Sequence, residues 1–350
     1  MARRNWNREE AIAKREQNLE LFAHHIERAV EQLVTGEDWL RAVRFAAQFR
    51  TRSFQNTLAI WVQHQNAYNK GLAPDPFPTY VAGFKDWKRL NRYAIAGRSY
   101  LILSPVHTLF APSDPASGTW RRLEKGEKPR TGETVRRERT GFAPAHVWDV
   151  SQTTGDGEIP VKPVPALLQG QAPEGLWDGL TTVVKTEGFA VRDVPDAAAI
   201  HDANGVTDFT ERSVSVRLDM DDAARVKTLA HELGHVLLTD PELRGHDMHR
   251  GIWEVEAESF AAMIGGCYGL DTSRYTVPYV AGWAETVKDK TPIEVMRATG
   301  KRVMDKAVET LERLPEPPLG NGLPVGPDQP ERHVPARDRG RRAIPKPVAL

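Results

Sequence analysis

The pentapeptide His231-Glu232-Leu233-Gly234-His235 constrains this chain more than any other part of its sequence. On an α-helix, residues four apart lie on one face, so both imidazoles can reach a single cation. The glutamate between them stays available as a base, which is the pattern of zinc-dependent hydrolases. Because the chain contains eleven histidines, the pentapeptide alone is not decisive, and the flanking sequence has to be considered.

The flanking residues predict a helix that carries both histidines. Asp219 to Asp222 supply N-cap candidates and acidic residues for a first turn, and Pro241 ends the pattern. The apolar stripe of this helix consists of Val226, Leu229, Ala230, Leu233 and Leu237. The motif therefore lies on an amphipathic helix with a buried side.

A catalytic zinc usually has three protein ligands, so a third ligand has to lie downstream. An extended motif with a third histidine is absent, because Leu238 and Pro241 occupy the positions that it requires. His246 and His249 also follow the motif, and we expect them in a solvated loop.

A second predicted helix, from Trp253 to Tyr268, offers carboxylates instead of a histidine. Glu254 and Glu258 share one face of it, whereas Glu256 points about 200° away from Glu254. We therefore predict Glu254 as the third ligand and Glu258 as an outer acceptor for a histidine N–H. Glu256 is expected to face solvent.

The sequence as a whole predicts an α+β chain with a helix-rich N-terminal domain, a linker, a second domain and a tail. The second domain is expected to be zincin-like, with a short mixed sheet. Nine prolines in the tail argue against a buried core there, so the tail is predicted to be disordered. The predicted boundaries are 1–154 for the first domain, with a small sheet, 155–175 for the Pro/Gly-rich linker, 176–314 for the second domain and 315–350 for the tail.

Composition limits the classes of function. Lysine plus arginine and aspartate plus glutamate number 47 each, so a chain that binds polyanions over its whole surface is not indicated. Between Arg121 and Arg139, however, eight basic and four acidic residues predict an exposed hairpin or mobile loop. The single cysteine, Cys267, excludes an intramolecular disulfide and a cysteine-based zinc site. We expect no signal peptide, no membrane contact and a cytoplasmic location.

Two stretches of the chain resemble known families. The pentapeptide together with Glu254-Val-Glu-Ala-Glu258-Ser-Phe-Ala261 is similar to the zincin-type metallopeptidase domain of the ImmA/IrrE and ArdC group. The segment from Asn56 through Val81-Ala-Gly-Phe84 to Pro105, with residues 147–153, resembles the single-stranded-DNA-binding domain of ArdC-type proteins. The resemblance covers about residues 7–310, in the domain order of ArdC-like antirestriction proteins.

This resemblance implies a Zn²⁺ ion on His231, His235 and Glu254, with Glu232 as the catalytic base. In such enzymes zinc activates water and polarises the scissile carbonyl, and the glutamate passes the proton to the leaving amine. Peptide hydrolysis is the reaction that this site predicts.

Single-strand binding requires a basic groove and aromatic faces on which bases stack. The N-terminal half offers both, although most of its aromatic residues fit helical core spacing. Ala96 stands where the family usually has a lysine, which weakens the expected basic patch. The candidate DNA-binding residues are Arg50, Arg52, Lys85, Lys88, Arg89, Arg92 and Arg98.

Two classes of function follow. In the first, the chain is a zinc metallopeptidase that its N-terminal domain brings to single-stranded DNA or to a DNA-bound protein substrate, in antirestriction or mobile-element regulation. In the second, it is a DNA-binding antirestriction or accessory protein whose zinc domain is structural or regulatory. A proteolytic toxin would share the same site. The sequence specifies neither the peptide substrate nor the oligomeric state.

Overall fold

The computed structural model describes most of the chain. The described residues are 8–33, 35–114, 119–124, 126–157, 170–239, 250–270, 284, 290–318 and 320–324. Most of the predicted linker and the tail beyond residue 324 therefore lie outside the described residues.

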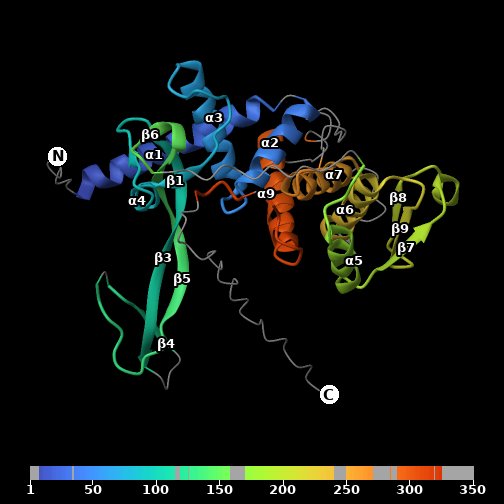
Figure 1. Cartoon of the computed structure of the whole chain (residues 1–350). Helices are drawn as coiled ribbons and strands as arrows, with labels where there is room; N and C mark the ends of the chain where they lie inside the picture. Colours follow the sequence, from blue (N-terminus) through green and yellow to red (C-terminus); the bar gives the residue numbers. More distant parts are fainter. Residues whose placement is uncertain are drawn as a thin grey trace.

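The chain has an α+β fold, as predicted (Figure 1). The N-terminal half contains α1 (Arg8–Glu31), α2 (Gly36–Gln48), α3 (Phe54–Asn69), β1 (Val81–Gly83), α4 (Phe84–Arg89), β2 (Tyr93–Ala94), β3 (Tyr100–Asp114), β4 (Thr119–Arg122), β5 (Arg136–Asp149), the 3₁₀ helix η1 (Val150–Gln152) and β6 (Thr153–Thr154). The C-terminal half contains α5 (Leu176–Thr186), β7 (Ala190–Val194), the 3₁₀ helix η2 (Ala197–Ile200), β8 (Gly205–Asp208), β9 (Ser213–Arg217), α6 (Asp222–Leu238), α7 (Arg250–Cys267) and α9 (Pro292–Leu311).

The strands form small sheets rather than one large one. Strand order is β1-β5-β3-β4 in the largest sheet, and β2 pairs with β6. In the C-terminal sheet, of order β7-β9-β8, the β7–β9 pair is parallel and the β8–β9 pair antiparallel. This sheet is mixed, and β8 is one of its edges.

One hydrophobic cluster runs through both halves of the chain. It contains Leu33 and Trp39 from the N-terminal half together with Leu233, Phe260 and Val303 from the C-terminal half. The indole N–H of Trp39 donates a buried hydrogen bond of 2.8 Å to Ser259 Oγ, which links α2 to α7. The division at 155–175 into two domains stays a prediction, since the described residues of both halves share this core.

The first part of the predicted tail is packed against the N-terminal half. Val81 N–H donates to the carbonyl of Gly322 at 2.9 Å, and Arg50 donates to the carbonyl of Gly320 at 3.0 Å. Gly322 has φ of +76°, and a Cβ there would lie 2.3 Å from the Phe49 ring. The prediction of disorder from residue 315 onward is therefore wrong for 315–318 and 320–324. The high proline content argues against a buried core within the tail. It does not show that a backbone carbonyl of the tail accepts a hydrogen bond from the distant strand β1.

No helix among the described residues is long and apolar enough to span a membrane.

Candidate metal centre

Helix α6 presents the two histidines of the pentapeptide on one side. Its N-cap is Asp221, whose carboxylate accepts a hydrogen bond from Ala224 N–H at 2.8 Å, and Val226, Leu229, Ala230 and Leu233 of its apolar stripe are buried. Gly234 lies where α6 meets α7, and a Cβ there would come within 2.8 Å of Ala257 Cα. The absence of a side chain at Gly234 thus allows the two helices to approach closely.

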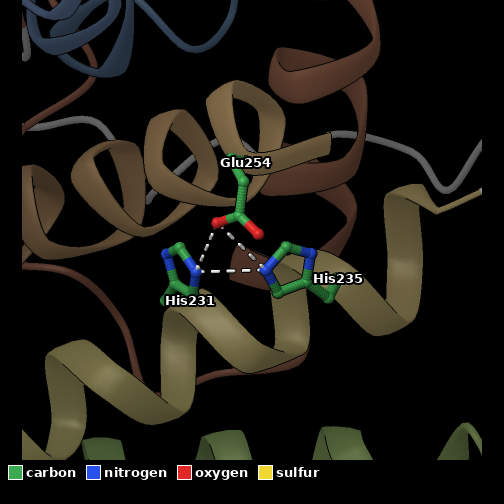
Figure 2. Close-up of side chains that lie close together, drawn as sticks. All are labelled: His231, His235 and Glu254. Carbon is green, nitrogen blue, oxygen red and sulfur yellow. Dashed lines mark hydrogen bonds and ion pairs between the residues drawn. The ribbon is translucent and has the colours of Figure 1, made fainter. Parts of the chain in front are cut away.

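Helix α7 carries Glu254 to the histidine pair (Figure 2). Glu254 Oε2 lies 3.6 Å from His231 Nε2 and 3.6 Å from His235 Nε2. The two Nε2 atoms lie 3.1 Å apart. The histidine side chains are 22% and 14% exposed, whereas that of Glu254 is 51% exposed, so the cluster is open to solvent on the Glu254 side.

These three residues fit a divalent cation. When two metal–ligand bonds of about 2.0–2.1 Å meet at the tetrahedral angle of ~109°, the two ligand atoms lie about 3.3 Å apart. The observed separations of 3.1, 3.6 and 3.6 Å bracket that value. Among the described residues, this is the group of His, Cys, Asp and Glu side chains that has such a geometry. Two imidazole nitrogens and one carboxylate oxygen suit Zn²⁺ and other divalent transition metals.

Glu258 holds the ring of His231 from the other side. Its Oε2 lies 3.0 Å from His231 Nδ1, which leaves Nε2 directed at His235 and Glu254. Burial acts to lower the pKa of His231, but the carboxylates of Glu254 and Glu258 outweigh burial and raise this pKa to about 10. The two imidazoles in turn lower the pKa of Glu254. The cluster therefore favours a positive charge at the point where the three ligand atoms converge.

Glu232 follows His231 directly on α6, about 100° around the helix axis, and its side chain packs against strand β8. Its side chain is buried, and the hydroxyl of Thr207 donates to Glu232 Oε2 at 2.7 Å. A Cβ at Gly205 would lie 2.9 Å from Glu232 Oε1, so this glycine makes room for the carboxylate. Thr207 and Gly205 were not predicted as site residues, because only the packing of β8 on α6 brings them to Glu232.

Glu256 is buried, contrary to the prediction that it faces solvent. Helical spacing correctly turns it away from Glu254, but α9 packs on that side of α7. Arg302 Nη1 from α9 lies 3.2 Å from Glu256 Oε1, and neither carboxylate oxygen accepts a hydrogen bond from a described residue. Burial raises the pKa of Glu256 to about 7, although the charge of Arg302 acts in the opposite direction.

The Glu256→Gln variant is therefore expected to be more stable than the wild-type protein in alkaline solution. A carboxyl whose pKa is raised on folding stabilises the folded state below about pH 4.5 and loses this effect as the pH rises through about 7. At pH 8 we expect a gain of about 3 kcal/mol in the free energy of unfolding, and near pH 4.5 almost none. Urea unfolding of both proteins across this range, at equal metal content, measures the difference. A gain that does not vary with pH would contradict the assignment.

Several predicted DNA-binding arginines make contacts within the fold. Arg52 is partly buried and donates to Val81 O at 2.6 Å, and burial lowers its pKa to about 10. Arg92 donates to Thr153 Oγ1 at 2.9 Å and to the carbonyl of Gly157 at 3.1 Å. The sequence does not predict these hydrogen bonds, because it does not show that the carbonyls of Val81 and Gly157 lie next to the two arginines.

The other candidates differ in exposure. Arg50 reaches the carbonyl of Gly320, and Arg89 pairs with Asp86 on α4. Lys85 and Lys88 are exposed on α4, and Arg98 is half-buried. The structure thus does not gather the seven residues into one exposed basic surface. Among the aromatic residues that the structure describes in this half, the buried ones are Phe22, Trp39, Phe45, Phe49, Phe54, Trp61, Tyr80, Trp87 and Tyr100.

Comparisons with known proteins give distant similarities. No family model matches the chain. An uncharacterized protein of Bacillus anthracis is 23% identical over 302 residues, which are 79% of this chain and 49% of that protein. The chain therefore spans about half the length of this curated relative.

Two crystal structures of the antirestriction protein ArdC from plasmid R388 are structural neighbours. The metal-free structure aligns over 75% of this chain and 84% of its own, with a TM-score of 0.43 and 16% identity. The Mn(II)-bound structure aligns over 83% of this chain and 97% of its own, with a TM-score of 0.45 and 18% identity. The resemblance to the ImmA/IrrE zincin domain stays a prediction.

Proposed function

We propose that this chain is an ArdC-like antirestriction or mobile-element accessory protein that depends on a divalent cation. The observation that carries this proposal is the convergence of His231, His235 and Glu254, with ligand atoms 3.1 to 3.6 Å apart. The sequence resemblance of both halves to ArdC-type proteins supports the biological context. We propose Zn²⁺ as the resident ion, and the same ligands would also accept Mn²⁺.

In this proposal the ion joins two elements of the fold. Its ligands come from α6 and α7, which already touch at Gly234, so binding would stabilise that contact. Glu258 would keep the tautomer of His231 suitable for binding through Nε2. A structural or regulatory role of the metal requires no further residues.

A second candidate function is peptide hydrolysis at the same centre, and the position of Glu232 favours it. A divalent cation held there would supply Lewis acidity to a water molecule and to a carbonyl oxygen. Glu232 follows a ligand directly, and Thr207 holds its carboxylate in place as a base would require. The edge strand β8 would offer backbone groups to an extended peptide.

The Glu232→Gln variant separates the two functions. It keeps all three ligands and a side chain of similar size, so its metal content should equal that of the wild-type protein. If the metal is structural, the variant should still protect an incoming plasmid from a restriction endonuclease in a conjugation assay. If the centre hydrolyses peptides, we expect this protection and any proteolysis to fall by at least about 100-fold.

Two outcomes would contradict the proposals. Wild-type protein that contains no divalent cation after purification and does not take one up would refute the metal centre and both functions. Wild-type protein that binds the ion but gives no protection against any restriction endonuclease would refute the antirestriction role alone.

A further inference from the structure

The longest strands of the protein form an arm that extends away from the helices (Figure 1). Strands β3 and β5 pair antiparallel along Tyr100 to Phe110, and β4 continues the pairing from Phe110 to Asp114. At about 3.3 Å per residue, the fifteen residues of β3 span about 50 Å. Gln63 and Asn56 of α3 form hydrogen bonds with the beginning of β3, at Leu101 and Leu103. None of the described residues from 104 to 122 belongs to the hydrophobic core, so the distal arm contributes little to it.

Arginines point to both faces of this arm. Arg137 and Arg139 lie opposite Leu109 and His107, and together with His107 they form what we call the His107 face. Arg136 and Arg122 both lie opposite Phe110, and with Trp120 they form the Trp120 face. Side chains alternate along a strand, so the run Arg136-Arg137 directs one guanidinium to each face.

The acidic residues of the arm are mostly paired with other side chains. Arg121 binds Glu127 and, at 3.1 Å, Glu133, while Arg136 pairs with Glu138. These pairs leave Arg122, Arg137 and Arg139 exposed on the two faces.

Two aromatic side chains accompany the exposed arginines. The guanidinium of Arg139 lies 5.3 Å from the centre of the Phe142 ring, and that of Arg136 lies 5.6 Å from the Trp120 ring. Trp120 is 43% exposed and Phe142 46% exposed. The stacked guanidinium of Arg139 is thereby held at the surface of the arm, where it presents positive charge to a partner, whereas Arg136 also pairs with Glu138.

We propose that this arm enters the major groove of duplex DNA. Most of the arm is two strands wide, with β3 paired to β5 as far as Phe110 and to β4 beyond it, and three strands lie side by side at Phe110. Neighbouring strands lie about 4.8 Å apart, and a groove about 12 Å wide admits a two-stranded ribbon. A ribbon inside a groove meets one phosphate row on each side, and arginines on both faces match these two rows. Single-stranded DNA requires instead a groove in the protein that follows the backbone, whereas the arm is a projection.

This inference rests on the proposed function, since it names the DNA surface of an antirestriction or accessory protein. It does not involve the metal centre, however, which lies on α6 and α7. The exposed basic residues that carry it differ from the seven candidate DNA-binding residues, but they lie in the basic segment 121–139 that the sequence predicts as an exposed hairpin or mobile loop.

The experiment compares the full chain with an Arg122→Ala/Arg137→Ala variant, which removes one arginine from each face. Binding to a fluorescent duplex of about 20 base pairs is measured between about 50 and 200 mM salt. At about 3.4 Å per base pair, this duplex is longer than the ~50 Å strand β3. We expect the affinity of the variant at 100 mM salt to fall by about tenfold or more. The slope of log K against log salt should become shallower by about 2.

An Arg41→Ala/Lys301→Ala variant serves as the matched control, because both residues are exposed, lie on α2 and α9 and take part in ion pairs. It should bind the duplex within about twofold of the wild-type protein, and thermal melting should show both variants folded. Equal affinity and slope for the wild-type protein and the arm variant would overturn the inference. So would stronger binding of a single strand of the same length. Either result leaves the metal content and the Glu232→Gln assay unaffected, so the proposed metal centre is tested separately.

Discussion

The His235→Ala variant is expected to lose the divalent cation and every activity that depends on it. His235 supplies one of three ligand atoms, and two remaining ligands on a partly exposed surface would compete poorly with water. Changes to residues that merely orient a ligand cost about 10- to 100-fold in metal affinity, so loss of a ligand itself should cost more than about 100-fold. Elemental analysis after dialysis and calorimetric titration with Zn²⁺ and Mn²⁺ measure this loss.

His24→Ala is a suitable control for this experiment, because His24 is exposed on α1 and takes no part in the cluster. It should retain the metal content of the wild-type protein. Metal should also raise the melting temperature of the wild-type protein and of this control but not that of the His235→Ala variant, since a ligand stabilises the state that binds it. Equal metal content in the wild-type protein and the His235→Ala variant would show that the ion binds elsewhere.

The Gly234→Val variant is expected to lose stability and metal affinity together. A Cβ at Gly234 would lie 2.8 Å from Ala257 Cα and 3.1 Å from Ala257 O, which are backbone atoms that cannot rotate away. Helices α6 and α7 would have to separate, and this would move the histidines away from Glu254. Overpacking of this kind typically costs 1–3 kcal/mol, and we expect about 3 kcal/mol in urea unfolding.

A second glycine, Gly266, provides a matched control for this prediction. Gly266 also lies in α7, but a Cβ there would meet nothing within 4 Å. Gly266→Ala should therefore be neutral or stabilising by up to about 1 kcal/mol, since alanine favours helix more than glycine does. Gly234→Ala should be less harmful than Gly234→Val and still weaken metal binding. If both positions tolerate alanine equally, close helix packing at Gly234 is not required.

The sequence alone could predict the parts of the site that follow from helix geometry. His231 and His235 are on one helix, and their relative position is set by four residues of regular backbone. The prediction of Glu254 as the third ligand follows from the same regular spacing on a second helix. The structure brings these three side chains together, with Glu258 against His231.

The parts that the sequence could not predict depend on contacts between distant segments. Glu256 is buried because α9 covers it, and nothing near Glu256 in the sequence indicates that helix. Arg52 and Arg92 are basic residues of the kind that bind nucleic acids, yet their guanidinium groups donate hydrogen bonds to backbone carbonyls within the fold. Thr207 contacts Glu232 only because β8 packs on α6.

The buried bond between Trp39 and Ser259 has a consequence for how this protein can be studied. Helix α7 bears Glu254, a proposed metal ligand, on one side and packs against α2 of the N-terminal half on another. A fragment that begins after residue 175 would expose the apolar surface that α2 now covers. Neither half is thus a module that can be excised and assayed in isolation, and biochemical dissection has to rely on point substitutions in the intact chain.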